Sequence, residues 1–157
     1  MAVRDAFSTA EWRTVGAAPF LVGLYLVGAS QSSPMGIVTE MLAAEKAVTL
    51  EASQPDGLPI VKEIEADLVA EVLTRDFGLI DGAEETQARV LGELTLALAL
   101  VKTQAPGLDS AFRAWLFRVA EHVARASAEG QPGGRRLIGD HELDALHTLA
   151  GLLGVPR

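Results

Sequence analysis

The sequence predicts an all-α fold, a compact bundle of about seven helices in a single domain, and three observations predict it. Hydrophobic residues make up 49% of the 157 residues but aromatic residues only 5%, so Leu, Val and Ala must build the core, which suits helix packing. Apolar residues recur three and four positions apart along most of the chain, as on one face of a helix. The breaks, at 31–34, 54–58, 78–82 and 105–107, are short, which favours antiparallel neighbours in a bundle.

One stretch, PFLVGLYLVG at 19–28, has no charge and almost no polar atom. A helix that is apolar on all sides must be buried on most of them. We therefore expect a central helix that begins at Pro19, where a missing amide is tolerated, and runs to about Ser30. An apolar run of about a dozen residues is too short to span a membrane, which takes about 20, so no membrane partner is expected.

A short helix is expected before the central one, over Thr9–Val15. Ser8 and Glu11 have the spacing of a capping box, in which each side chain accepts a hydrogen bond from the other residue's backbone amide. Gly16 is expected to end this helix, because glycine lowers helix stability. Residues 1–7 are expected to be a loose lead-in.

Three helices are expected in the middle of the chain. The first runs from Met35 to about Ala52, and its apolar face comprises Ile37, Met41, Ala44 and Val48 with the neighbouring Val38 and Leu42. The second begins at Pro59 and ends near Gly78, with apolar residues at 60, 61, 64, 68, 69, 72 and 73. The third covers Ala83–Thr103, and its leucine-rich part, Val90–Val101, is expected to be the second deeply buried helix.

Two more helices complete the prediction. One runs from Asp109 to about Ala128, and the last begins at Gly139 with an apolar stripe of Leu143, Leu146, Leu149, Ala150 and Leu153. Gly154 and Pro156 are expected to end it. The segment 130–137 between these helices contains GQPGG and is expected to be a flexible loop.

Composition excludes several functions. The chain has no cysteine, which rules out disulfides, thiolate metal sites and cysteine nucleophiles. Its formal net charge is −8. The basic footprint of a nucleic-acid-binding protein is absent. We expect an acidic cytoplasmic protein. Its charge is polarised, with a net −5 from Lys62 to Arg89 and a net +3 from Arg113 to Arg136. This pattern could join two copies or attract an anionic partner, with an ordinary solvated surface as the alternative.

Two segments of the chain resemble each other. One leads from Leu24 through a turn of small residues to a helix with Glu40 near its start, and the other leads from His122 through a glycine-rich turn to a helix that starts near Glu142. A duplicated helical hairpin would explain the likeness. Chance is the alternative, because Ala, Val and Leu are common in this chain.

The second copy carries a family resemblance. Its segments are Val119-Ala-Glu-His-Val-Ala, Glu142-Leu-Asp-Ala-Leu-His-Thr-Leu-Ala and Leu-Leu-Gly-Val155, joined by a glycine-containing turn. They resemble the tellurite-resistance TerB-like helical domain. The resemblance covers about a third of the chain. The resemblance implies an all-helical bundle with an internal two-fold repeat and a stress-related role.

The resemblance also implies acidic residues that bind a metal near the loops. Glu129, followed by a glycine, would be the acid that ends one helix, and Glu142 the acid that begins the next. Asp140 lies beside Glu142, and Glu40 matches it in the first copy, where Ser30-Gln31 stands in place of the other acid. A divalent cation at these carboxylates is the alternative to a protein without a cofactor.

Two other sets of acidic and histidine residues have ordinary explanations. Glu63, Asp67 and Glu71 lie four apart in the predicted helix, and like charges at this spacing repel. We expect compensation from Lys62, from Arg75, from a bound cation or from water. On the last helix, Asp140, His141, Asp144 and His147 lie away from the leucine stripe, so a solvated polar face is expected there ahead of a metal site.

Arg118, His122 and Arg125 share one face of the helix predicted at 109–128 and could meet an anionic partner. A catalytic pair of His122 with Glu121 would need a pocket that reaches His122. No P-loop and no G-x-S-x-G motif is present. The leading hypothesis is a non-enzymatic helical domain that acts through protein contacts, with an unknown protein or a second copy in a homodimer as partner.

Overall fold

Six α-helices and two short 3-10 helices make up the described structure. The computed structural model describes residues 2–30, 34–71, 73, 83–129 and 140–155, and the side chains of 2–26, 41–71, 73, 87–126 and 143–155. The elements are η1 Val3–Ala6, α1 Thr9–Ser30, α2 Pro34–Ser53, α3 Pro59–Val69, α4 Ala83–Gln104, η2 Pro106–Leu108, α5 Asp109–Glu129 and α6 Asp140–Leu153. No strand occurs among these residues, and the predicted all-α class is confirmed. The loop predicted at 130–137 lies outside the described residues.

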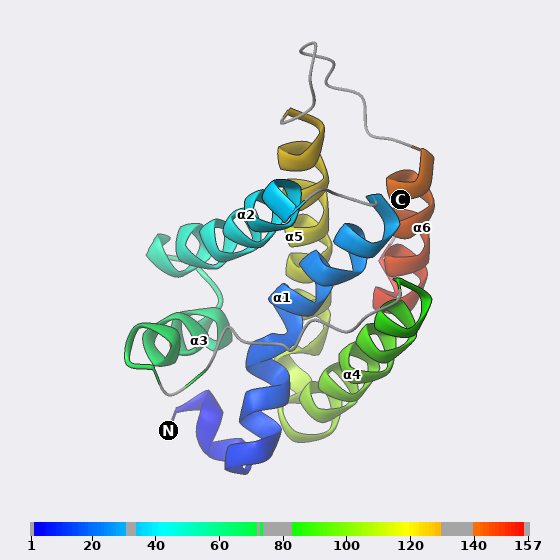
Figure 1. Ribbon diagram of the computed structural model, residues 1–157. Helices are drawn as coiled ribbons and strands as arrows, with labels where there is room; N and C mark the ends of the chain where they lie inside the picture. Colours follow the sequence, from blue (N-terminus) through cyan, green and yellow to red (C-terminus); the bar gives the residue numbers. More distant parts are fainter. Residues whose placement is uncertain (1, 31–33, 72, 74–82, 130–139, 156–157) are drawn as a thin grey trace.

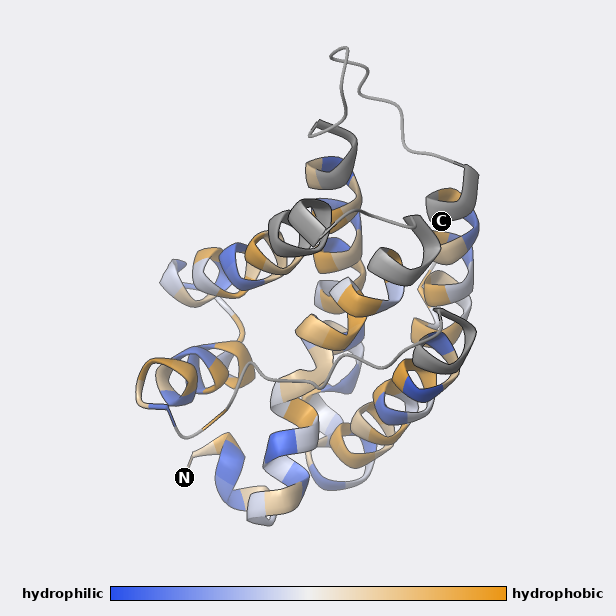
Figure 2. Cartoon of the chain, in the orientation of Figure 1, coloured by the Kyte–Doolittle hydropathy of each residue, from blue (hydrophilic) through white to orange (hydrophobic). Residues whose placement is uncertain are grey.

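Helix α1 is the centre of the bundle (Figure 1). Every residue from Ala18 to Leu26 is buried, and α1 contacts α2, α4, α5 and α6. Figure 2 shows the hydrophobic colouring of this middle part of α1. The prediction of a central, buried apolar helix is confirmed. In the described part of the chain, no helix combines the length and hydropathy that membrane crossing requires.

The predicted break at Gly16 is wrong, because α1 is one continuous helix with Pro19 inside it. A Cβ atom on Gly16 would lie 2.6 Å from Cδ1 of Leu73. Gly16 therefore allows Leu73 to approach the helix backbone closely. Burial of the surrounding apolar residues offsets the about 1 kcal/mol that glycine costs inside a helix. The fusion of two predicted helices accounts for six α-helices in place of about seven.

Helix α4 lies antiparallel to α1 and is tied to it at both ends. The Gln87 side-chain amide donates to the Tyr25 carbonyl at 3.3 Å, and the Gln104 amide donates to Glu11 at 2.8 Å. The prediction that Val90–Val101 is a second deeply buried helix is wrong, because the segment is buried on one side only, through Val90, Leu94, Ala97, Leu98 and Val101. Leu96 is 52% exposed. Leucines at 94, 96, 98 and 100 alternate along the sequence as they would in a strand, but this segment is helical, with Leu94 and Leu98 on the buried face and Leu96 on the exposed one.

Helices α5 and α6 complete the bundle. Helix α5 contacts α1, α2 and α6, and the Arg113 guanidinium donates to the carbonyl of Leu152 at 3.3 Å, which joins the start of α5 to the end of α6. Gly154 has a φ of 68° and the Val155 amide donates to the Ala150 carbonyl at 3.1 Å, so Gly154 ends α6 as predicted. In the predicted leucine stripe, only Leu143 is exposed.

Helix α3 is shorter than predicted and ends at Val69. Glu71 has a φ of 60°, and the Leu73 amide donates to the Asp67 carbonyl at 3.1 Å. This turn carries Leu73 into the core beside Gly16, while Val69, expected on the buried stripe, is exposed. Burial of Leu73 against α1 thus takes the place of continued helix after Val69. Residues 74–82 lie outside the described structure.

Candidate functional site

The four carboxylates predicted to bind a metal lie on described backbone. Glu40 is in α2, Glu129 is the last residue of α5, and Asp140 and Glu142 are in the first turn of α6. The end of α5 and the start of α6 lie at the same end of the molecule (Figure 1). The four side chains lie outside the described residues, so this metal site stays a prediction. Where side chains are described, no group of three His, Cys, Asp or Glu could hold a metal ion.

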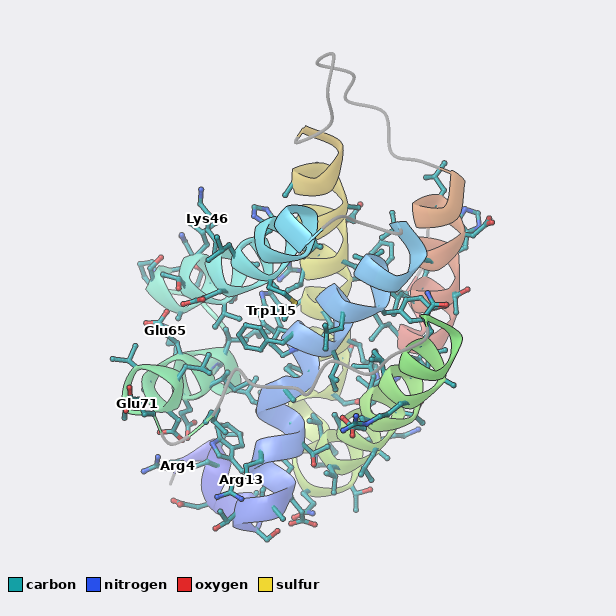
Figure 3. All side chains as sticks on the ribbon, viewed as in Figure 1. Arg4, Arg13, Lys46, Glu65, Glu71 and Trp115 are labelled. Carbon is teal, nitrogen blue, oxygen red and sulfur yellow. The ribbon has the colours of Figure 1, made fainter. Side chains whose placement is uncertain are left out.

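The acidic stripe of α3 holds the N-terminal residues. Glu63 accepts hydrogen bonds from the backbone amides of Val3 at 2.8 Å and Arg4 at 3.1 Å. The residues predicted as a loose lead-in are therefore anchored to α3 from Val3 onwards, because their amides and the Glu63 carboxylate satisfy each other. Figure 3 shows Arg4 near α3.

Asp67 is buried and fully paired. One guanidinium nitrogen of Arg4, Nη1, donates to both carboxylate oxygens, at 2.7 Å and 3.0 Å, and Nε1 of Trp12 donates to Oδ2 at 2.8 Å. The hydrogen bond to Asp67 and its negative charge raise the pKa of Arg4. Arg4 thus supplies the compensating charge, which the sequence assigned to Lys62, Arg75, a cation or water. Glu71 is not part of the stripe, since it follows the end of α3.

A pocket of about 320 Å³ lies beside this pair, between η1 and the start of α1. Its lining residues are Arg4, Asp5, Phe7, Ser8, Thr9, Trp12 and Asp67. The rings of Phe7 and Trp12 pack at 5.9 Å between centroids, and both side chains are buried. Arg4, Trp12 and Asp67 already bind one another here, so we assign the cluster a structural role.

A second pocket of about 320 Å³ lies between α2 and α5, and we call it the α2–α5 groove. Its lining residues are Ala47, Leu50 and Glu51 from α2, Gln54 just after the end of α2, and Trp115, Arg118, Val119 and His122 from α5. On α5 these residues have the spacing i, i+3, i+4, i+7, and on α2 the spacing i, i+3, i+4, so each set forms one stripe of its helix. The groove is therefore the space between two facing helix stripes.

The floor of the α2–α5 groove is apolar and firmly packed. Trp115 and Val119 are buried, and the Trp115 ring stacks on Phe112 with 5.9 Å between centroids and 28° between planes. Figure 3 shows Trp115 between α5 and α2. Leu50 stands at the rim and is 47% exposed. Trp115 and Val119 thus close the bottom of the groove, and Leu50 supplies its exposed apolar surface.

The charged groups of the groove differ in what they bind. Oε2 of Glu51 accepts the Leu58 amide at 2.9 Å, which fixes the turn between α2 and α3, and Oε1 lies 3.7 Å from the guanidinium of Arg118. The Arg118 side chain is 59% exposed, and 3.7 Å is too long for a hydrogen bond. Arg118 therefore keeps donors available to a ligand, whereas Glu51 is held in place by backbone.

The pocket that a catalytic His122 would require is present, but the predicted partner is not in it. His122 is half-buried and lines the groove. Glu121 is not a lining residue, and its Oε2 lies 3.9 Å from Arg125, as expected since adjacent helical residues do not face each other. Asp144 and His147 on α6 are exposed, as predicted for a solvated face.

Sequence reasoning found the basic residues of the α5 face but missed the groove. Helical spacing places Trp115 and Val119 beside Arg118 and His122 and could have shown the α5 side of the groove. It could not show that α2 and α5 pack against each other. No family model, no curated protein and no solved structure matches the chain.

Proposed function

We propose that this chain is a non-enzymatic helical domain that acts through protein contacts, as expected for a TerB-like module. The observation that carries the proposal is the α2–α5 groove together with two apolar side chains exposed on α2, Leu42 at 59% and Leu50 at 47%. Exposed apolar surface beside a preformed pocket is typical of interaction sites. Trp and Arg, here Trp115 and Arg118, are the residues most enriched at the energetic centres of protein interfaces.

The helix contacts support the TerB-like part of the proposal. In the hairpins α1–α2 and α5–α6, α1 contacts α5, α1 contacts α6, and α2 contacts α5. If the two hairpins are exchanged, α1 takes the place of α5, and α2 takes the place of α6. The α1–α6 contact then becomes the α5–α2 contact, and the α1–α5 contact is unchanged. A two-fold repeat, which the resemblance implies, would have this contact pattern.

Photo-cross-linking tests the proposal. A photoreactive amino acid is placed, one at a time, at the five large apolar residues that are exposed in the described structure, Leu42, Leu50, Val69, Leu96 and Leu143. We expect a discrete protein adduct in cells of the source organism at Leu42 and Leu50, and none at Leu96 on the far helix. Absence of an adduct at all five positions would overturn the proposal. Light scattering at micromolar concentration then reports whether a second copy is the partner.

Divalent-cation binding at Glu40, Glu129, Asp140 and Glu142 is the second candidate. It is favoured by the placement of the end of α5 and the start of α6 at one end of the molecule (Figure 1). Calorimetric titration with Ca²⁺, Mn²⁺ and Zn²⁺ separates the two candidates. Saturable heat that is lost in the Glu129→Gln, Glu142→Gln double variant supports the cation site, and no heat with no shift in melting temperature removes it.

A further inference from the structure

We propose that the α2–α5 groove binds an acidic amphipathic helix of a partner protein, with one apolar side chain over Trp115 and carboxylates at Arg118 and Lys46. This inference rests on the proposed function and names the surface and the chemistry of the partner. Three properties of the groove lead to it: its apolar floor, its shape and the direction of its charges.

The apolar floor fixes the anchor. Ala47 and Leu50 line one side of the groove and Trp115 and Val119 the other. The stacking of Trp115 on Phe112 holds the floor rigid before binding, which lowers the entropy cost of association. A large apolar side chain of a partner fills such a pocket without rearrangement of the bundle.

The shape of the groove favours a helix. Its α5 side is a helix stripe with i, i+3, i+4, i+7 spacing and its α2 side a stripe with i, i+3, i+4 spacing. Helices pack by fitting the ridge of one into the groove of another. The exposed surface continues along α2, where Leu42, Lys46 and Leu50 are four residues apart and all exposed. A partner helix laid along α2 would cover Leu42 and Leu50 together.

The charges select an acidic helix. The side chains of Arg118 and Arg125 are 59% and 67% exposed, Lys46 is also exposed, and Lys46 projects outward from α2 (Figure 3). The acids nearby are less exposed: the Glu51 side chain is 18% exposed and binds the Leu58 amide, and the Glu121 side chain is 41% exposed and lies 3.9 Å from Arg125. In both ion pairs the arginine is the more exposed partner, and exposed cations attract carboxylates.

Selection from a random-sequence peptide display library on the purified full chain tests the inference. We expect the selected peptides to combine Asp or Glu with Leu, Phe or Trp at helical spacing. Their affinity should fall more than tenfold in Arg118→Glu and in Leu50→Asp, and should weaken as salt is raised. Arg118→Gln, which keeps a polar side chain but removes the charge, should give an intermediate loss.

The matched control is Arg89→Glu on α4, which reverses an arginine of similar exposure away from the groove and should leave peptide affinity unchanged. Circular dichroism checks that each variant is folded. Peptides enriched in Lys and Arg, peptides insensitive to Arg118→Glu, or no enrichment at all would overturn the inference. If cross-links at Leu50 persist after such a result, the proposed function holds and only the acidic partner is wrong. A cross-link from Leu50 to a second copy would also overturn it.

Discussion

At the scale of single residues, Asp67 is the side chain whose replacement should be most informative. It is the one charged residue that is buried in the described part of the chain, at 4% exposure, and it accepts hydrogen bonds from Arg4 and Trp12. In Asp67→Ala the buried indole N–H of Trp12 has no acceptor, so we expect a loss of about 1–3 kcal/mol of unfolding free energy. Urea denaturation measures it.

The variant Asp67→Asn separates charge from hydrogen bonding. It retains an acceptor for the Trp12 indole but not the charge that binds Arg4, so its loss of unfolding free energy should be smaller than that of Asp67→Ala. Asp144→Ala, at an exposed position on α6, is the control and should change stability by less than about 0.5 kcal/mol. Wild-type stability in Asp67→Ala would show that the buried cluster contributes nothing.

Two glycines should respond to alanine in opposite directions. A Cβ at Gly57 would lie 2.1 Å from the backbone carbonyl oxygen of Glu51, while a Cβ at Gly92 on α4 meets nothing within 4 Å. Gly57→Ala must displace the turn after α2 and should cost about 1–3 kcal/mol, whereas Gly92→Ala should stabilise the helix by about 0.5–1 kcal/mol. Thermal melting of both variants checks the contrast, and equal shifts would contradict it.

At the scale of elements, the start of α1 has the capping box that the sequence predicts. The Ser8 amide donates to Glu11 at 2.7 Å, and the Glu11 amide donates to the Ser8 hydroxyl at 3.1 Å. The hydrogen bond from the Ser8 backbone, followed by that from Gln104, lowers the pKa of Glu11 below its ordinary value of 4.5. The stabilisation by this carboxylate is therefore complete above pH 4.5 and is lost as pH falls through the lower folded-state pKa.

The variant Glu11→Gln should reveal this pH dependence. Its side chain can still accept the Ser8 hydrogen bond but does not titrate. The melting temperature of wild type should exceed that of the variant above pH 4.5, and the gap should narrow on further acidification. A gap that is constant between about pH 7 and about pH 3 would mean that Glu11 does not titrate differently in the folded and unfolded chain.

Most helices could be predicted from local patterns, and the errors came from tertiary contacts. The bounds of α2, α4 and α5 agree closely with the prediction, because capping signals and apolar spacing are local. Gly16 was interpreted as a helix breaker since glycine has low helix propensity, but its position opposite Leu73 decides its role. Similarly, α3 ends early because Leu73 is buried against α1, which no pattern around residue 70 reveals.

At the scale of the whole molecule, the candidate site could be predicted only in part. The face formed by Arg118, His122 and Arg125 is visible in the sequence, because all three lie on one helix. The apolar half of the groove needs Leu50 and Ala47 from a helix more than 60 residues earlier. The compensation of the α3 acids by Arg4 depends on an equally distant contact, and helix periodicity contains no information on either.

The position of α1 predicts that the chain unfolds as one unit. Since α1 contacts α2, α4, α5 and α6, none of these helices can keep its buried face if α1 is lost. Leu21, on α1, is 2% exposed. Leu21→Ala should cost about 2–5 kcal/mol, because it leaves a cavity at the centre. Helical circular dichroism and tryptophan fluorescence should report one coincident transition.

Leu96→Ala makes the same chemical change on the outer face of α4, where the side chain is 52% exposed. It should alter the unfolding free energy by less than about 0.5 kcal/mol. If circular dichroism and tryptophan fluorescence instead reported separate transitions in Leu21→Ala, α1 would not couple the helices around it. Fluorescence comes from Trp12 on α1 and Trp115 on α5, so the remaining tryptophan in Trp12→Phe and in Trp115→Phe would then identify which side of the bundle unfolds first.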